Sequence, residues 1–297
     1  METEEYLNKI IQKESIAEDS PELKALRAEK EKVEKIISDA FDGKPVIRYA
    51  GSYKKGTMVK GSYDLDVVCY FKCDDDSAGD NLEDIFNNVK KSFENDYFVF
   101  PKKSALRLQG KNDKIDFHID VVPGRFVDDS ESDAFLYQSE GDKKRLKTNL
   151  DAHISHIKDS GLTKTIKLAK IWKGVYALSV KTFVLELLVV KIVDDLKDKN
   201  GIGECLKKMF TELDENISNI AIEDPANPAG NDLSGLFDDS IKSSLSAAAK
   251  SALKSINDGK WEDLFGPVED ASKDYVADSL RSSASSRANG PKPWLDI

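Results

Sequence analysis

The stretch that decides the fold is residues 51–71, GSYKKGTMVKGSYDLDVVCYF, in which a glycine-rich segment leads into two aspartates and an apolar run. The run Val67–Phe71 is long enough for a buried strand. Side chains alternate along a strand, so we expect Asp64 and Asp66 on one side, about 7 Å apart along the backbone. Two carboxylates at this spacing repel each other unless a cation lies between them, and Mg²⁺ takes carboxylate oxygens. The pair indicates a metal-dependent phosphoryl- or nucleotidyl-transfer site; the alternative is a polar turn with two solvated aspartates.

Length and composition bound the class of protein. A chain of 297 residues makes one large or two ordinary domains, and its apolar fraction is that of a soluble globular protein. The acidic first residues have no apolar h-region, and no apolar run reaches the roughly 18 residues that a membrane span requires. Three cysteines without a C-x-x-C pair are typical of a reducing compartment. We therefore expect a cytoplasmic protein with no membrane association.

The charge balance argues against bulk binding of duplex nucleic acid, whose affinity comes from neutralised phosphates. The formal net charge is −10. Two local basic clusters suit a small phosphate ligand better than a long polyanion: Lys54, Lys55 and Lys60, and Lys143, Lys144, Arg145 and Lys147.

Periodicity predicts a sheet in the first half of the chain and helices in the second. Expected strands cover residues 46–49, 66–71, 97–101, 105–108 and 114–122. Expected helices cover residues 1–18, 21–41, 81–95, 179–193, 233–256 and 269–283, and Ser20-Pro21 is a helix-start signal. The composition changes near residue 150, so we predict two lobes, 1–150 and 151–297.

A third carboxylate is available at the end of the last expected strand. Asp116, His118 and Asp120 alternate with apolar residues, and Asp120 is the stronger candidate because it directly precedes Val121-Val122-Pro123. We interpret Asp116 as a supporting or solvent-side residue and His118 as an ordinary strand residue. In the second half, His153 and His156 are expected to be exposed on a helix, whereas Glu186, inside an apolar helix, needs a partner if it is buried.

Taken in order, these motifs resemble those of the polymerase-β-like nucleotidyltransferases. The branch they resemble most contains the oligoadenylate synthases, cGAS and the bacterial cGAS/DncV-like enzymes (CD-NTases). In the first half the resemblance is carried by Gly51-Ser52, Lys55-Gly56-Thr57, Asp64-Leu65-Asp66 and Asp120-Val121-Val122-Pro123. In the second half it is carried by residues 166–172 (IKLAKIW), the helix from Ser179 to Leu188 that ends in LELL, Asp224-Pro225 with Asn231-Asp232, and residues 261–266.

The resemblance implies an α+β, bilobal enzyme with a mixed-sheet catalytic lobe, a helical C-terminal lobe and a long N-terminal helix that spans both. It also implies two Mg²⁺ ions, or Mn²⁺ in their place, held by Asp64, Asp66 and Asp120. The triphosphate of an NTP would be held in the cleft between the lobes by the Gly51-Ser52 segment, Lys170 and Ser179.

Within the family, the sequence favours a cyclic oligonucleotide synthase over its relatives. A tRNA nucleotidyltransferase would have a longer chain and a basic surface, and an RNA-activated oligoadenylate synthase would have a basic spine. A cGAS-like enzyme would have a His/Cys zinc cluster. None of these features is evident in this sequence. The expected product is a cyclic di- or trinucleotide second messenger made from ATP and other NTPs in bacterial antiphage (CBASS) signalling. We expect a monomer or weak oligomer, a regulatory protein partner and no obligatory duplex nucleic acid. The alternative from another class is a catalytically silent nucleotide-binding interaction protein.

Overall fold

The computed structural model describes residues 1–17, 19–60, 65–111, 119–199 and 201–268, and shows an α+β chain with a mixed sheet. The described strands are β1 (Val46–Ala50), β2 (Leu65–Phe71), β3 (Tyr97–Pro101), β4 (Leu106–Gly110), β5 (Ile119–Phe126), β6 (Asp133–Tyr137) and β7 (Arg145–Asn149). The helices of at least four residues are α1 (Thr3–Glu14), α2 (Pro21–Ala40), α3 (Gly51–Lys55), α4 (Leu82–Phe93), α5 (Leu150–Lys158), α6 (Thr163–Val175), α7 (Thr182–Val193), α8 (Ile202–Glu215), α9 (Asp239–Asn257) and α10 (Glu262–Phe265). The helix expected over 269–283 lies outside the described residues.

The strand order is β1-β2-β5-β4-β3, with β6 paired to β5 and β7 paired to β6. β2 and β5 run parallel, and the other neighbours run antiparallel. The β6–β7 hairpin was not among the expected strands. Gly124 allows β6 to pack closely against β5, because a Cβ atom there would lie 2.7 Å from Leu136 Cδ2 and 2.9 Å from the Phe135 carbonyl oxygen.

The two faces of the sheet have different neighbours. Leu65, Val67 and other odd-numbered residues of β2 belong to a core shared with α2 and α4. Val68 and Tyr70 point to the opposite face, where they pack with α5. Asp66 shares the parity of these residues, so it belongs to the face that α3 and α5 adjoin.

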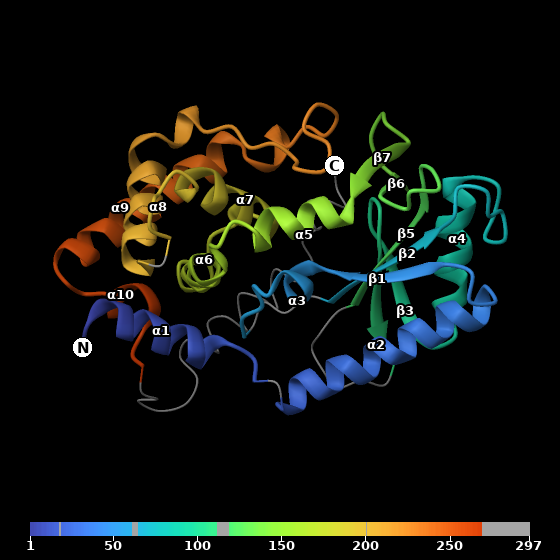
Figure 1. The fold of residues 1–297 in the computed structure, drawn as a ribbon, viewed down its shortest axis with the longest axis horizontal. Coiled ribbons are helices and arrows are strands. Elements are labelled where there is room, and N and C mark those ends of the chain that lie inside the picture. Colours follow the sequence, from blue (N-terminus) through green and yellow to red (C-terminus); the bar gives the residue numbers. More distant parts are fainter. Residues whose placement is uncertain (18, 61–64, 112–118, 200, 269–297) are drawn as a thin grey trace.

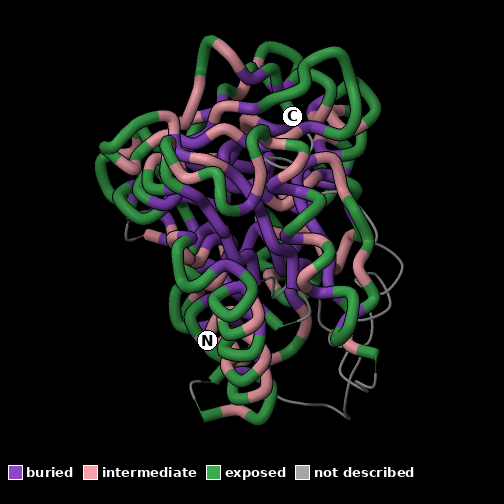
Figure 2. Tube along the Cα trace, turned by 90° about the vertical axis from the view of Figure 1, so that its right-hand side faces the viewer, coloured by how far each residue is buried: buried purple, intermediate pink, exposed green. Residues whose placement is uncertain are grey.

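The later part of the described chain is helical, and α7 lies at its centre. Ten of the twelve α7 residues are buried, which confirms the expectation that this apolar helix is internal. In Figure 1 the helices α6–α10 gather at one end of the molecule and the strands at the other, with α3 and α5 between them. Figure 2 shows buried backbone through the centre and exposed backbone around it. The division near residue 150 stays a prediction, although β7 ends and α5 begins there.

The N-terminal element that connects the two halves is two helices rather than one continuous helix. α1 packs against α6 and α8, and its Tyr6 hydroxyl donates to the Gly266 carbonyl just after α10 at 2.6 Å, whereas α2 packs against α4 and β2 (Figure 1). Ser20 caps α2 by accepting a hydrogen bond from the Leu23 N–H at 3.1 Å, and Pro21 is the first helical residue, as predicted. Within the described residues, no helix has the length and hydropathy needed to span a membrane.

Candidate functional site

The candidate site is a row of residues across the sheet. Strand register pairs Ala50 with Asp66, Asp66 with Asp120, and Asp120 with Arg107. Directly opposite residues on neighbouring strands share a face, so Asp66 and Asp120 lie side by side, with their Cα atoms about 5 Å apart. Both aspartates are buried, at 0 % and 1 % exposure. The structure therefore brings together two of the three predicted carboxylates, and Asp64 lies outside the described residues.

Arg107 is the residue of this row that the sequence did not suggest. Its Nε donates to Asp120 Oδ1 at 3.0 Å and its Nη2 donates to Oδ2 at 3.1 Å. This bidentate ion pair is buried, so Arg107 balances the carboxylate charge in a part of the protein where an uncompensated charge is costly. The sequence did contain one indication of this role, because an arginine between Leu106 and Leu108 in an otherwise apolar strand needs a partner if it is buried.

The Gly51-Ser52 segment follows Ala50 directly and so lies next to the carboxylates. It forms the short helix α3 rather than an open loop, and Gly51 has φ of 72°, a left-handed conformation that glycine adopts without strain. Ser52 is 6 % exposed. Its buried Oγ has no hydrogen-bond partner among the described residues, so this hydroxyl is available to a ligand at the row.

Lys170 lies in a buried ion network with Glu186. Its Nζ is 2.6 Å from Glu186 Oε1 and 2.8 Å from Thr57 Oγ1, and Lys55 binds the other carboxylate oxygen. Burial opposes ionisation of Glu186, but the ammonium groups of Lys170 and Lys55 outweigh it and hold its pKa at about 2. The expectation that Glu186 needs a partner is confirmed. The predicted contact of Lys170 with a triphosphate stays a prediction, and here Lys170 joins α6 and α7 to the segment after α3.

Other predicted residues occupy different surroundings. Ser179 is exposed in the segment between α6 and α7. Lys55, expected in a basic surface cluster, is buried against Glu186. From the second basic cluster, Lys143, Arg145 and Lys147 line a groove of about 420 Å³ between the β6–β7 hairpin and the loop around Asn231.

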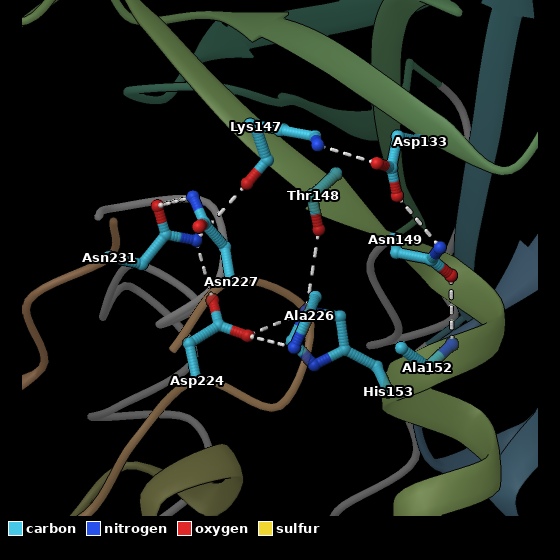
Figure 3. A network of polar contacts seen from close by, with 10 residues as sticks. All are labelled: Asp133, Lys147, Thr148, Asn149, Ala152, His153, Asp224, Ala226, Asn227 and Asn231. Carbon is cyan, nitrogen blue, oxygen red and sulfur yellow. Dashed lines mark hydrogen bonds and ion pairs between the residues drawn. The ribbon is translucent and has the colours of Figure 1, made fainter. Parts of the chain in front are cut away.

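His153 contradicts the expectation of an exposed histidine. It is buried, and its Nε2 lies 3.3 Å from both Asp224 Oδ1 and Thr148 Oγ1 (Figure 3). Burial lowers its pKa to about 4 although Asp224 opposes this shift, so the ring is neutral at pH 7 and the contact is not an ion pair. Helix amphipathicity was the missed signal, since His153, Ile154 and Ile157 lie on the buried side of α5.

The same network orders the predicted Asp-Pro…Asn loop. Asp224 Oδ2 accepts a hydrogen bond from Asn231 Nδ2 at 2.7 Å, and Oδ1 accepts one from the Ala226 N–H at 2.8 Å (Figure 3). Asn231 also donates to the Lys147 carbonyl at 3.2 Å. The loop is thereby attached to both β7 and α5.

The donor set of the row fits a hard divalent cation. Asp66 and Asp120 offer carboxylate oxygens from adjacent strands, which suit Mg²⁺ or Mn²⁺ better than softer metals. In the described part of the chain, no group of three or more His, Cys, Asp or Glu side chains forms a metal site. Asp64 and Asp116 lie outside the described residues.

Comparisons with known proteins bear on the sequence and the fold as a whole. No protein-family model matches the chain. It is 25% identical over 263 residues to the cyclic AMP-AMP-AMP synthase of Escherichia coli (strain MS 115-1), with coverage of 73% of this chain and 81% of that protein.

Solved structures share the fold. CdnC of E. coli MS115-1 with ATP matches with a TM-score of 0.67 and 20% identity, and covers 89% of this chain and 98% of its own. The cyclic AMP-GMP synthase DncV of Vibrio cholerae matches with a TM-score of 0.68 and 16% identity, and the match covers 89% of this chain and 95% of DncV. The CD-NTase CdnG of Bradyrhizobium diazoefficiens with GTP matches with a TM-score of 0.69 and 13% identity, and the match covers 93% of this chain and 97% of CdnG. The expected nucleotidyltransferase fold is confirmed.

Proposed function

We propose that the chain is a cGAS/DncV-like nucleotidyltransferase, because its sequence and fold are similar to those of such enzymes, and that it joins ATP units into a cyclic oligonucleotide and releases pyrophosphate. The observation that carries the proposal is the in-register pair Asp66–Asp120 beside the Ser52 hydroxyl, which has no hydrogen-bond partner among the described residues. Nucleotidyl transfer requires carboxylates where the hydroxyl attacks and hydrogen-bonding groups where the triphosphate lies. This row supplies both at adjacent positions.

The residues that would hold two Mg²⁺ ions are Asp64, Asp66 and Asp120. Such ions neutralise the charge that develops on the attacking and leaving oxygens. The chain itself does the positioning. Ser52 Oγ donates to the triphosphate from the β1 side of Asp66, and Asp120 orients the attacking nucleotide from the β5 side. Arg107 holds the Asp120 carboxylate in place through its two hydrogen bonds.

Substrate and product are proposed from the relatives. The curated relative makes cyclic AMP-AMP-AMP, and DncV makes cyclic AMP-GMP. We propose ATP as the main substrate, other NTPs as additional ones, and a cyclic di- or trinucleotide as the product, used as a second messenger in bacterial antiphage (CBASS) signalling in the cytoplasm.

Regulation is proposed on a similar basis. CdnC of E. coli MS115-1 has been solved in a complex with HORMA-deltaN. We propose that this chain, a monomer or weak oligomer, is likewise controlled by a protein partner and needs no duplex nucleic acid. We also propose that the nucleotides bind between two lobes, residues 1–150 and 151–297. In this arrangement Gly51, Lys170 and Ser179 contact the phosphates.

The test is synthesis by the purified protein with Mg²⁺ and labelled NTPs, resolved by chromatography against cyclic standards. We expect phosphatase-resistant products that disappear with EDTA. Asp66→Asn and Asp120→Asn should each lower the rate at least 100-fold, because each removes a charge that metal binding requires. Asp120→Asn also removes the anion that Arg107 pairs with, so its melting temperature is compared with that of wild type. Asp75→Asn, on a loop, is the matched control and should retain activity.

Each of the other possible results of this assay would support a different function. Linear products alone would favour oligoadenylate-synthase-like activity, and transfer to tRNA 3′ ends without free products would favour a tRNA nucleotidyltransferase. Nucleotide binding without any product, with or without a partner, would indicate a silent binding protein.

A further inference from the structure

Two exposed phenylalanines lie on the edge strand β3. Phe98 is 53% exposed and Phe100 is 47% exposed. In the part of the chain that the structure describes, the other large hydrophobic residue at this level of exposure is Met1, at the terminus. Exposed aromatic rings at alternate positions of one strand share one face, and clustered exposed aromatics often mark binding surfaces.

Strand register places these rings on the face that carries the site. Tyr97 and Val99 pack into the core with α2 and α4, so Phe98 and Phe100 project from the opposite face, the face of Asp66 and Asp120. Phe100 pairs with Arg107, which pairs with Asp120. Phe100 therefore extends the catalytic row by one strand beyond Arg107.

The spacing fits a nucleotide. Neighbouring strands lie about 4.8 Å apart, so Phe100 is about 10 Å from Asp120 and about 14 Å from Asp66, measured across the sheet. Ser52 lies at the other end of the row, on the β1 side. A triphosphate at Ser52 and an attacking hydroxyl at Asp120 leave the base of the attacking nucleotide on the β4–β3 side.

The surroundings of the rings are open and partly cationic. Gln109, which pairs with Phe98, is also exposed, so this part of the face is uncovered. Lys111 Nζ lies 5.9 Å from the centre of the Phe98 ring, and it is held there by hydrogen bonds to the carbonyl oxygens of Glu94 and Asn95. The Lys111 ammonium group adds a fixed positive charge beside the ring, and this charge attracts a negatively charged ligand.

We propose that Phe98 and Phe100 form a stacking platform for the base of the nucleotide that carries the attacking hydroxyl, whether this is a free nucleotide or the end of the growing product. The inference rests on the proposed nucleotidyl transfer and assigns to β3 the acceptor side of that reaction. Stacking on an aromatic ring tolerates every base, because each base has a π-face. The platform thus supplies affinity for the acceptor and leaves base selection to other groups.

The kinetic test separates acceptor from donor. The acceptor is the dinucleotide ApA, which has free ribose hydroxyls and no triphosphate, and the donor is ATP. Phe98→Ala with Phe100→Ala should raise the KM for ApA about tenfold or more, since each lost stack weakens binding by about this factor. The KM for ATP as donor should change less than twofold. Phe100→Tyr retains the ring and should behave as wild type, whereas Phe100→Leu retains only the apolar bulk and should behave like Phe100→Ala.

Direct binding of AMP, measured by calorimetry without Mg²⁺, decides the proposal independently of turnover. We expect the double alanine variant to bind AMP about tenfold more weakly than wild type, with an unchanged melting temperature because both side chains are exposed. Equal affinity in the two proteins, or wild type that fails to bind AMP, overturns the platform. A changed sedimentation coefficient with unchanged AMP affinity would overturn it in favour of a protein-docking edge. If wild type binds AMP at the rings but makes no oligonucleotide, the platform stands and the proposed function fails.

Discussion

At the scale of single residues, the molecule contains charges that only their partners make tolerable. Glu186 is buried between Lys55 and Lys170, and Asp120 is buried against Arg107. Removing one member of a buried pair leaves the other charge uncompensated, which costs about 3 to 5 kcal/mol. Lys55 and Glu186 connect segments that are far apart in the chain, and Arg107 and Asp120 connect the neighbouring strands β4 and β5, so both pairs also fix the geometry of the site.

Glu186→Gln should destabilise the fold at neutral pH by about 3 kcal/mol, because it leaves two buried ammonium groups without their anion. The folded pKa of about 2 lies below the ordinary value of 4.5, so the stabilisation is complete above pH 4.5 and is lost as pH falls from 4.5 towards 2. Urea unfolding at several pH values measures this. The difference in stability between wild type and variant should close across that window, whereas Glu5→Gln, at an exposed position, should leave stability nearly unchanged. A gap that does not depend on pH would contradict the assignment.

His153→Gln should reduce the pH dependence of stability between pH 6.5 and 4, a range that lies mostly above the one in which Glu186 titrates. The folded pKa of about 4 lies below the ordinary 6.5, so from pH 6.5 down to 4 the unfolded chain takes up a proton that the native state resists. Wild type should lose about 3 kcal/mol of stability over this range, and the variant should lose much less. The exposed His156 on the same helix supplies the control, and His156→Gln should keep most of the wild-type slope. Equal slopes for His153→Gln and wild type would show that this ring is not the group responsible.

At the scale of elements, close approach of strands positions the site. β5 carries Asp120 and pairs with β2, β4 and β6, and Gly124 makes room for the last of these. The hairpin β6–β7 then leads directly into α5. The Asn149 side chain caps α5 by accepting from the Ala152 N–H, and it also donates to Asp133 (Figure 3).

Gly124→Ala should destabilise the protein by about 1 to 3 kcal/mol, because its Cβ would meet Leu136, the Phe135 carbonyl oxygen and Tyr70 at 2.7, 2.9 and 3.0 Å. Thermal unfolding is the measurement. Gly235→Ala, where a Cβ would meet nothing within 4 Å, is the matched control and should be nearly neutral. A Gly124→Ala variant as stable as the control would mean that β6 can shift without loss.

At the scale of the whole molecule, two polar networks join the sheet half to the helical half. One connects Lys55 and Thr57 to α6 and α7 through Glu186, and the other connects β7 and α5 to the loop at Asp224 (Figure 3). These two networks fix the position of the helical half relative to Asp66 and Asp120 on the sheet.

Asp224→Ala should loosen the second connection. It removes the acceptor of the part-buried Ala226 N–H and one of the two acceptors of the buried Asn231 amide, at a cost of about 1 to 3 kcal/mol for the buried amide group. Hydrogen–deuterium exchange should accelerate at residues 226–231 and 146–148, and Glu223→Ala, at the exposed neighbouring residue, should leave exchange unchanged. Acceleration confined to the loop, with β7 still protected, would contradict a connection between the halves.

The sequence by itself predicted the sheet-to-helix order, the candidate metal-binding carboxylates and the resemblance to nucleotidyltransferases, because strand and helix periodicity and short motifs are local properties. It predicted β2 and the apolar helix α7, and it showed that Glu186 would need partners. Only the tertiary structure decided what those partners are, since Lys55, Thr57 and Lys170 reach Glu186 from distant segments. The same holds for Arg107 on Asp120, for burial of His153 and for Phe98 and Phe100 on the sheet face that carries Asp66 and Asp120. Each depends on which strands and helices become neighbours, and chain spacing does not contain that information.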